Sequence, residues 1–249
     1  MRCVKLLIAT AMIMPFTCMA QKSETYKVVK VQGEIQRVKT GNLLFLGEDV
    51  TNNENYNFKN EVSRAIVVNK EKGCLVLSSK ANNEGPQFLP SSNKMSVRAV
   101  LPTQPSEIME YYYGEVFVSG FDSLKIDNDK MKIDDVNYFS VKYDANGQSF
   151  NEKVELVNNS LVLPSSLLAN KPSTVTVCYN DEYGEKSKTD FTPVYADNSV
   201  LKEELNVIFT TLKGKQNEKV SASANFINDF YGKTTEEAVE SWIKANMGK

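Results

Sequence analysis

The 249-residue chain contains no histidine, and this absence removes several classes of active site at once. Ser-His-Asp and Cys-His nucleophilic sites need an imidazole as general base. Most zinc and iron sites use imidazole ligands, and the two cysteines that lie beyond residue 20 cannot supply four zinc ligands without histidine. The sequence also lacks a glycine-rich phosphate loop of the P-loop or dinucleotide type. We therefore expect no cofactor and no metal site.

A marked excess of positive charge is also missing. The chain carries 29 Lys and Arg against 31 Asp and Glu, a net charge of −2. Proteins that bind nucleic acid neutralise phosphates with clustered cations, and anionic lipid surfaces attract polybasic segments. No such cluster occurs here, so the composition argues against both kinds of partner.

Long apolar runs are absent as well. The longest, residues 6–14, is too short to cross about 30 Å of hydrocarbon as a helix. Arg2 and Lys5 precede it, and Cys18-Met19-Ala20 follows with small residues at the positions that signal peptidase recognises. This order predicts a cleavable signal peptide over residues 1–20 and export of the mature chain. A retained membrane anchor is the alternative.

Cysteine is scarce, with four in the chain, two of them in this leader. One of these, Cys18, could carry a lipid anchor, although Pro15 and Thr17 differ from the lipobox pattern. An oxidising compartment would permit a disulfide between the remaining two, Cys74 and Cys178. The alternative is that they are two small buried residues in separate domains.

Short apolar runs separated by turn residues predict a small β-barrel or sandwich domain over residues 21–101. The runs 65–68 and 74–77, joined by a five-residue polar loop, predict a hairpin. The run Leu43–Leu46 is typical of a buried strand. A proline-rich linker over residues 102–107 marks the domain boundary.

Three motifs follow one another in this region: Val31-x-Gly33-x-Ile35, then Leu46-Gly47-Glu48-Asp49-Val50, then Ser63-Arg64-Ala65-Ile66-Val67-Val68. In this order, over residues 26–80, they resemble the small periplasmic β-domain of FecR-type proteins. The resemblance implies a non-catalytic extracytoplasmic β-module. FecR proteins carry an anti-sigma segment and a membrane helix upstream, where this chain has only the predicted leader, so control of a sigma factor is not implied.

Residues 108–197 contain further strand-like runs, such as Tyr138–Tyr143 and Thr174–Tyr179. Asn146-Gly147 is a favoured hairpin turn, because both residues tolerate positive φ. The number and spacing of these runs predict an Ig-like β-sandwich. The Cys…Trp…Cys signature of true immunoglobulin domains is absent.

The pattern changes to helical spacing over residues 198–249, where Leu201, Leu205 and Ile208 begin an apolar stripe. Three short amphipathic helices cannot bury such stripes alone. We expect them to pack on each other, on the sandwich or on a partner. The predicted fold is thus mainly β with a helical C-terminal tail.

Three candidate sites stand out. The consecutive Tyr111, Tyr112 and Tyr113 would alternate sides on a strand, so one or two rings could stack on a sugar or anchor a protein; packing across the domain junction is the alternative. Ser123 lies in an Asp-Ser-Leu triplet that matches an O-glycosylation acceptor of some Gram-negative bacteria. Four carboxylates could serve a His-free glycosidase, or simply line a solvated turn: Asp127, Asp129, Asp134 and Asp135.

These features predict a non-catalytic exported binding or scaffold protein of a bacterial cell envelope, periplasmic or secreted. It would act through contacts with another envelope protein, without nucleic acid and without a transmembrane span in the mature chain. The alternatives are a carbohydrate-binding module built on the tyrosines and a hydrolase built on the aspartates.

Overall fold

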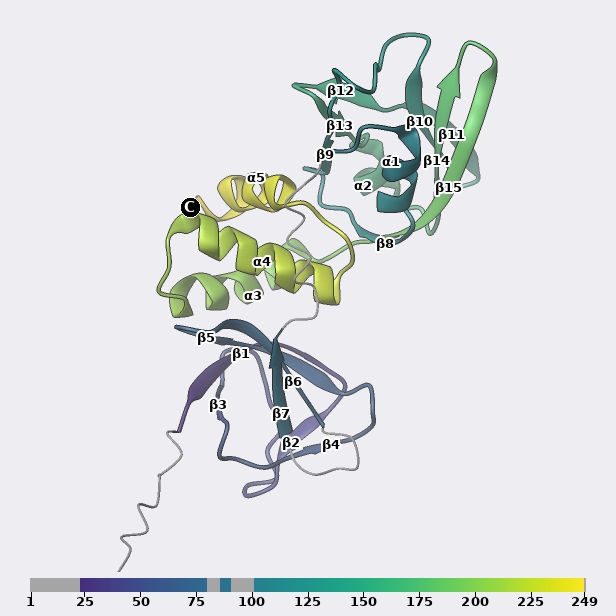
Figure 1. The fold of residues 1–249 in the computed structure, drawn as a ribbon. Helices are drawn as coiled ribbons and strands as arrows, with labels where there is room; N and C mark the ends of the chain where they lie inside the picture. Colours follow the sequence, from purple (N-terminus) through teal and green to yellow (C-terminus); the bar gives the residue numbers. More distant parts are fainter. Residues whose placement is uncertain (1–22, 80–85, 91–100, 249) are drawn as a thin grey trace, which may run out of the picture.

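The computed structural model describes residues 23–79, 86–90 and 101–248, and Figure 1 shows their arrangement. Two β-domains lie at opposite ends of the molecule, with a layer of three helices between them. Strand exceeds helix among these residues, which confirms the predicted mainly β fold with a helical C-terminal tail. The predicted signal peptide, with Cys18, lies outside the described residues. None of the described helices is long and apolar enough to cross a membrane.

The first β-domain is built on a five-stranded antiparallel sheet with the order β3-β1-β5-β6-β7. The predicted hairpin is confirmed as β5 and β6, with Ile66 opposite Val76. A second, two-stranded sheet pairs β2 with β4. The bounds are β1 Thr25–Gln32, β2 Ile35–Arg37, β3 Asp49–Thr51, β4 Tyr56–Phe58, β5 Arg64–Asn69, β6 Gly73–Ser79 and β7 Pro86–Pro90.

Both faces of the central strand β5 are buried. Ala65 and Val67 point into the core of the first β-domain, together with Tyr26, Ile35 and Tyr56 among others. Ile66 and Val68 point to the other face and pack against the helices. An antiparallel sheet with one wet face alternates apolar and polar residues. Here the second cover explains why β5 has a continuous apolar run.

The prediction that Leu43–Leu46 forms a buried strand is wrong. Leu44 is buried, but Phe45 is 60% exposed and Leu46 is 37% exposed. Only a short bridge, Gln36 to Leu43, pairs this segment with β2, and Gly47 then turns the chain with a φ of 81°. Successive side chains of an extended segment point to opposite sides, so Leu44 points into the core while Phe45 points to solvent.

Two residues of the FecR-like motifs contact each other. Gly33 has a φ of 73°, and a Cβ at this position would lie 2.5 Å from the Ser63 Oγ. Ser63 is itself almost fully buried. Both the backbone angle and the close approach therefore require glycine. The contact gives a physical reason for these two motif residues, while the family resemblance stays a prediction.

The second β-domain pairs a five-stranded sheet, β11-β10-β14-β15-β8, with a three-stranded sheet, β12-β13-β9. By their order in the chain, β11-β10-β14-β15 correspond to the C′-C-F-G strands of an Ig-like sandwich, and β12-β13-β9 correspond to its D-E-B strands. The remaining strand, β8, pairs with β15 at the edge of the larger sheet. At the predicted hairpin turn, Asn146 and Gly147 have φ values of 52° and 75°. The bounds are β8 Gly114–Phe117, β9 Ser123–Lys125, β10 Tyr138–Ala145, β11 Gln148–Lys153, β12 Glu155–Val157, β13 Ser160–Val162, β14 Val175–Asp181 and β15 Gly184–Val194.

Two short helices belong to this domain: α1 (Pro105–Tyr111) and α2 (Ser166–Asn170). The segment predicted as a linker, 102–107, is therefore a connection only in its first part, since α1 begins at Pro105. Proline is well tolerated in the first turn of a helix, where its missing N–H would have no partner. Pro105, which predicted a stiff linker, instead begins a helix.

The helical layer consists of α3 (Asn198–Thr211), α4 (Gln216–Phe230) and α5 (Glu236–Met247). Their apolar stripes pack on each other and on the outer face of the first β-domain, against Val29, Ile66 and Val68. Phe117 of β8 joins the same cluster from the second β-domain. The layer is also tied to β8 by backbone hydrogen bonds, since Phe117 N–H donates to the Lys233 carbonyl at 2.9 Å. The tail thus forms the joint between the two β-domains.

Candidate functional site

The three tyrosines lie at the end of α1, not on a strand as we expected. Tyr112 is 3% exposed and packs against Phe191, with 5.6 Å between ring centroids. Tyr111 is half-buried and contacts Tyr112 edge-to-face. Burial raises the pKa of both phenols. Only Tyr113 is exposed, so the triplet does not offer neighbouring rings on which a sugar could stack.

The four aspartates occupy the loop between β9 and β10. A hydrogen bond from Lys130 is the main cause that lowers the pKa of Asp127, and the Asn137 backbone N–H does the same for Asp134. Asp129 and Asp135 are exposed. A catalytic acid at neutral pH needs a raised pKa. The geometry instead favours the alternative interpretation, a solvated turn.

The remaining candidates are the acceptor serine Ser123 and the cysteine pair Cys74 and Cys178. Ser123 is half-buried on β9, and its carbonyl accepts a hydrogen bond from Thr235 Oγ1 at 3.0 Å. Glycans are bulky surface groups, so this position does not favour an acceptor serine. Cys74 and Cys178 are free thiols in different domains, so they do not form the possible disulfide, and the alternative of two unbridged residues holds. Burial raises the pKa of Cys74 to about 12 and that of Cys178 to about 11, which makes both thiols unreactive.

The first β-domain has an open groove of about 510 Å³. The turns that line it lie at the end of this domain that points away from the helices (Figure 1). One wall is the turn after β2, and the other is the turn between β3 and β4. Its lining is mostly polar: Val38, Lys39, Thr51, Asn53, Glu54 and Asn55. Ligand sites are concave and commonly enclose about 300–1,000 Å³. By size and position, this groove is the candidate functional site.

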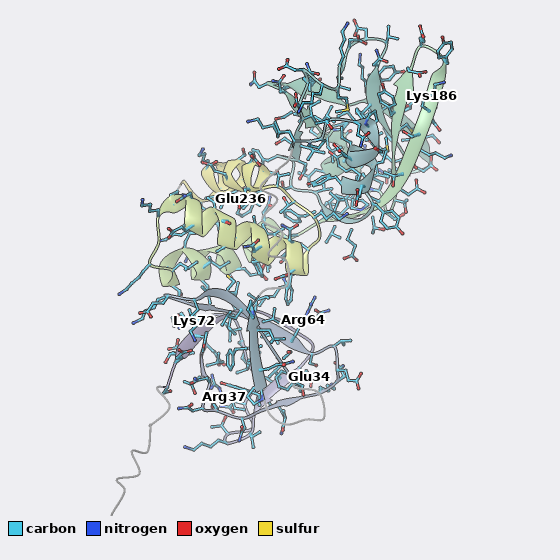
Figure 2. All side chains as sticks on the ribbon, viewed as in Figure 1. Glu34, Arg37, Arg64, Lys72, Lys186 and Glu236 are labelled. Atoms are coloured by element: carbon cyan, nitrogen blue, oxygen red, sulfur yellow. The ribbon has the colours of Figure 1, made fainter. Side chains whose placement is uncertain are left out.

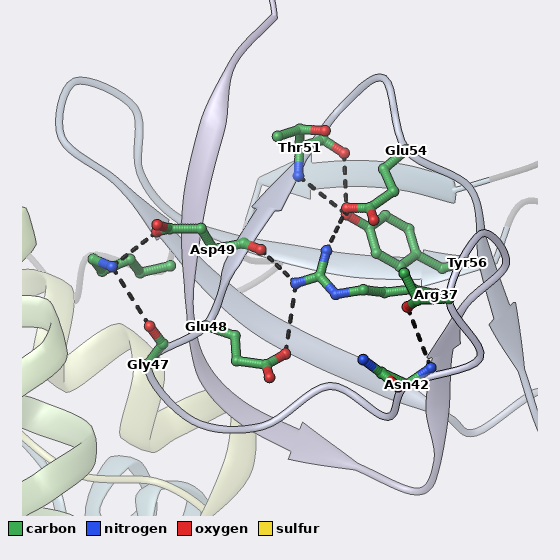
Figure 3. Close-up of polar contacts among 10 residues, drawn as sticks. Arg37, Asn42, Gly47, Glu48, Asp49, Thr51, Glu54 and Tyr56 are labelled. Carbon is green, nitrogen blue, oxygen red and sulfur yellow. Dashed lines mark hydrogen bonds and ion pairs between the residues drawn. The ribbon is translucent and has the colours of Figure 1, made fainter.

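Arg37 ties the two walls together, as Figure 3 shows. Its Nη1 donates to the Glu54 carboxylate at 2.5 Å, and its Nη2 donates to the Asp49 carbonyl at 2.5 Å. The same Nη2 lies 3.5 Å from a carboxylate oxygen of Glu48. The guanidinium is thus engaged by the protein itself. We assign Arg37 a positioning role and not a ligand-binding one.

Tyr56 completes this framework from β4. Its hydroxyl donates to the Glu54 carboxylate at 2.8 Å and accepts from the Thr51 N–H at 3.0 Å. Burial, followed by the bond to Glu54, raises the pKa of Tyr56. The hydroxyl therefore stays protonated and keeps donating. Both ends of the 51–54 turn are held in this way.

Other groups of the groove are free to meet a ligand. Lys39, Asn53 and Asn55 have exposed side chains. Within the described part of the chain, no hydrogen bond or ion pair engages the Lys39 ammonium or the two amides. Neighbouring lysines differ: Lys27 pairs with Asp49 at 2.8 Å, and Lys59 pairs with Glu34 at 2.5 Å.

Replacing Arg37 with alanine should lower the free energy of unfolding by about 2–3 kcal/mol, because Glu54 loses a partly buried ionic partner and Asp49 loses a donor. The comparison is urea unfolding followed by circular dichroism. Lys59→Ala is the matched control, since Lys59 forms an exposed ion pair, and it should cost less than about 1 kcal/mol. Equal losses for the two variants would contradict the positioning role.

A second polar cluster lies in the seam between the first β-domain and the helical layer. Lys30 Nζ on β1 donates to Glu204 on α3 at 2.7 Å and to the Tyr231 hydroxyl at 2.6 Å. The Tyr231 hydroxyl donates to the other Glu204 oxygen at 2.7 Å. The Glu204 side chain is only 5% exposed. Each member satisfies the other two, so this cluster joins two parts of the molecule and leaves no open site.

The sequence patterns did not predict the groove. Its walls come from two polar turns that only the pairing of β2 with β4 brings together. The available signal was the density of asparagine at positions 52, 53, 55 and 57, which indicates turns but not a site.

Comparisons of the chain with protein-family models, with curated proteins and with solved structures found no match.

Proposed function

We propose that the protein is a non-catalytic binding or scaffold protein of a bacterial cell envelope that acts through protein–protein contacts. The observation that carries the proposal is the helical layer between the β-domains, whose apolar stripes are buried. It fixes the far ends of both domains in relation to each other and leaves those ends open to partners. One end carries the groove, and the other carries the β9–β10 and β14–β15 loops of the Ig-like sandwich.

The loop end of the second β-domain supports the proposal because loops of this kind of sandwich cluster at its ends and commonly bind. Tyr183, in the turn between β14 and β15, is 79% exposed, and the Lys186 ammonium lies 4.7 Å from its ring centroid. Figure 2 labels Lys186 at the end opposite to Arg37 and Glu34. Exposed tyrosine is enriched at protein contact sites.

The two β-domains also differ in charge. Residues 102–197 contain 16 Asp and Glu against 8 Lys and Arg, whereas residues 23–79 contain 7 against 8. Complementary potentials help to select partners and speed their encounter. The difference supports two distinct partner surfaces on one molecule.

The test is capture of partners from the native envelope with the tagged mature protein, followed by mass spectrometry. We expect a reproducible partner that Tyr183→Ala or Lys39→Glu loses, and that Glu203→Ala, an exposed change on α3, retains. Failure to capture any reproducible partner would count against the proposal. The same material tests export: the native chain should begin at Gln21, and an intact Met1 in the cytosol would contradict the predicted localisation.

A further inference from the structure

We propose that the groove of the first β-domain binds an extended acidic peptide segment, with Lys39 pairing the carboxylate of that segment. This inference rests on the proposed function and names the kind of partner that one end of the molecule would take. It follows from the charge, the free polar groups and the rigidity of the groove.

Charge selects the sign of the ligand. Lys39 is the one cation among the residues that line the groove. The one anion of the lining, Glu54, is already paired with Arg37 and Tyr56. The groove thus presents an unpaired ammonium beside a neutralised carboxylate. An ammonium that pairs with a ligand carboxylate forms a charge-assisted hydrogen bond, which is stronger than a neutral one.

The other free groups favour a peptide. The amides of Asn53 and Asn55 each offer donors and an acceptor, which is the combination that a peptide main chain needs. Val38 is 53% exposed at the rim and offers an apolar contact to a side chain. No aromatic ring belongs to the lining. Rings that stack on the faces of sugars are therefore missing at this site, and an extended peptide fits its chemistry better than a saccharide.

One wall of the groove is held in place by side-chain hydrogen bonds, which lowers the entropic cost of binding. Arg37 and Tyr56 hold Glu54 and the 51–54 turn, so this wall is formed before a ligand arrives. Binding to a preformed site costs less conformational entropy than binding that must order a loop. The Arg37 framework therefore serves recognition as well as stability.

The test uses the mature full-length protein and synthetic nine-residue peptides, read out by fluorescence anisotropy. A library in which the central residue is Asp, and a matched library in which it is Asn, isolates the carboxylate. We expect the best Asp peptides to bind at least about tenfold more tightly than their Asn counterparts. Lys39→Glu should weaken them by about tenfold or more, and Asn55→Ala by a smaller factor. Lys202→Glu, which reverses an exposed lysine on α3, should leave binding unchanged.

Several results would overturn the inference. These are silence of the Asp library, equal binding of the Asp and Asn peptides, or unchanged binding by the Lys39→Glu variant. Binding to a glycan array and not to peptides would assign the groove to a saccharide instead. Circular dichroism of each variant separates lost binding from lost folding. If the peptides fail while the envelope partner is still captured and is lost by Tyr183→Ala, the proposed function stands and only the inference about the groove falls.

Discussion

The Glu204→Ala variant should lose about 3–5 kcal/mol of unfolding free energy, because it leaves the Lys30 ammonium without its anionic partner in the seam. Glu204 accepts from both Lys30 and Tyr231, and its side chain is 5% exposed. Urea unfolding of the mature protein measures the loss. The neighbouring Glu203→Ala, at an exposed position of α3, is the matched control and should change stability by less than about 0.5 kcal/mol.

A double variant sharpens this test. Lys30→Met combined with Glu204→Leu removes both charges together, and apolar replacement of a whole buried pair is often close to neutral. We expect the double variant to recover part of the stability that Glu204→Ala loses, because the Tyr231 hydroxyl is still left without its two partners. A double variant as unstable as the single one would mean that packing at α3, and not the ionic cluster, sets the cost.

The Trp242→Ala variant should lose a similar amount, about 3–5 kcal/mol, because it opens a large cavity in the helical layer. Trp242 is the single tryptophan of the chain and is 2% exposed. Its Nε1–H donates to the Asn198 side chain at 3.3 Å, which ties α5 to the start of α3. Thermal unfolding followed by far-ultraviolet circular dichroism reports the loss.

Trp242→Phe is the control for the cavity, because it keeps most of the ring volume and removes the hydrogen bond. We expect it to cost clearly less than Trp242→Ala. If Trp242→Ala lowered the free energy of unfolding by less than about 1 kcal/mol, Trp242 would not be an important packing residue of the helical layer.

Local patterns in the sequence were sufficient to predict much of the fold. Asn146-Gly147 predicts its hairpin because both residues tolerate positive φ values. The apolar stripe from Leu201 to Ile208 predicts α3 because its spacing matches the period of a helix. Patterns that depend on the surroundings failed. The apolar residues of Leu43–Leu46 gave no sign that only Leu44 turns inward. Nothing local showed that Tyr111–Tyr113 end a helix.

The sites depended on contacts between distant parts of the chain, which a single sequence does not reveal. Lys30 and Glu204 are 174 positions apart. In the sequence, each is an ordinary charged residue among apolar ones. The groove has the same origin, since Lys39 and Asn55 meet only when β2 pairs with β4. The continuous apolar run of β5 predicted a hairpin strand, but it did not show that the helical tail covers the second face of that strand.

The position of α3–α5 has a consequence for how the chain must mature. Residues 198–247 leave the ribosome after both β-domains and, if the chain is exported amino end first, would also be translocated after them. Until then Val29, Ile66 and Val68 would face water, together with the half-buried Val76 of the neighbouring strand. Such an uncovered sheet face invites aggregation. A premature stop codon shortly before α3 would therefore leave the apolar outer face of the first β-domain exposed. We expect such a truncated chain to aggregate unless a chaperone binds it or a protease degrades it.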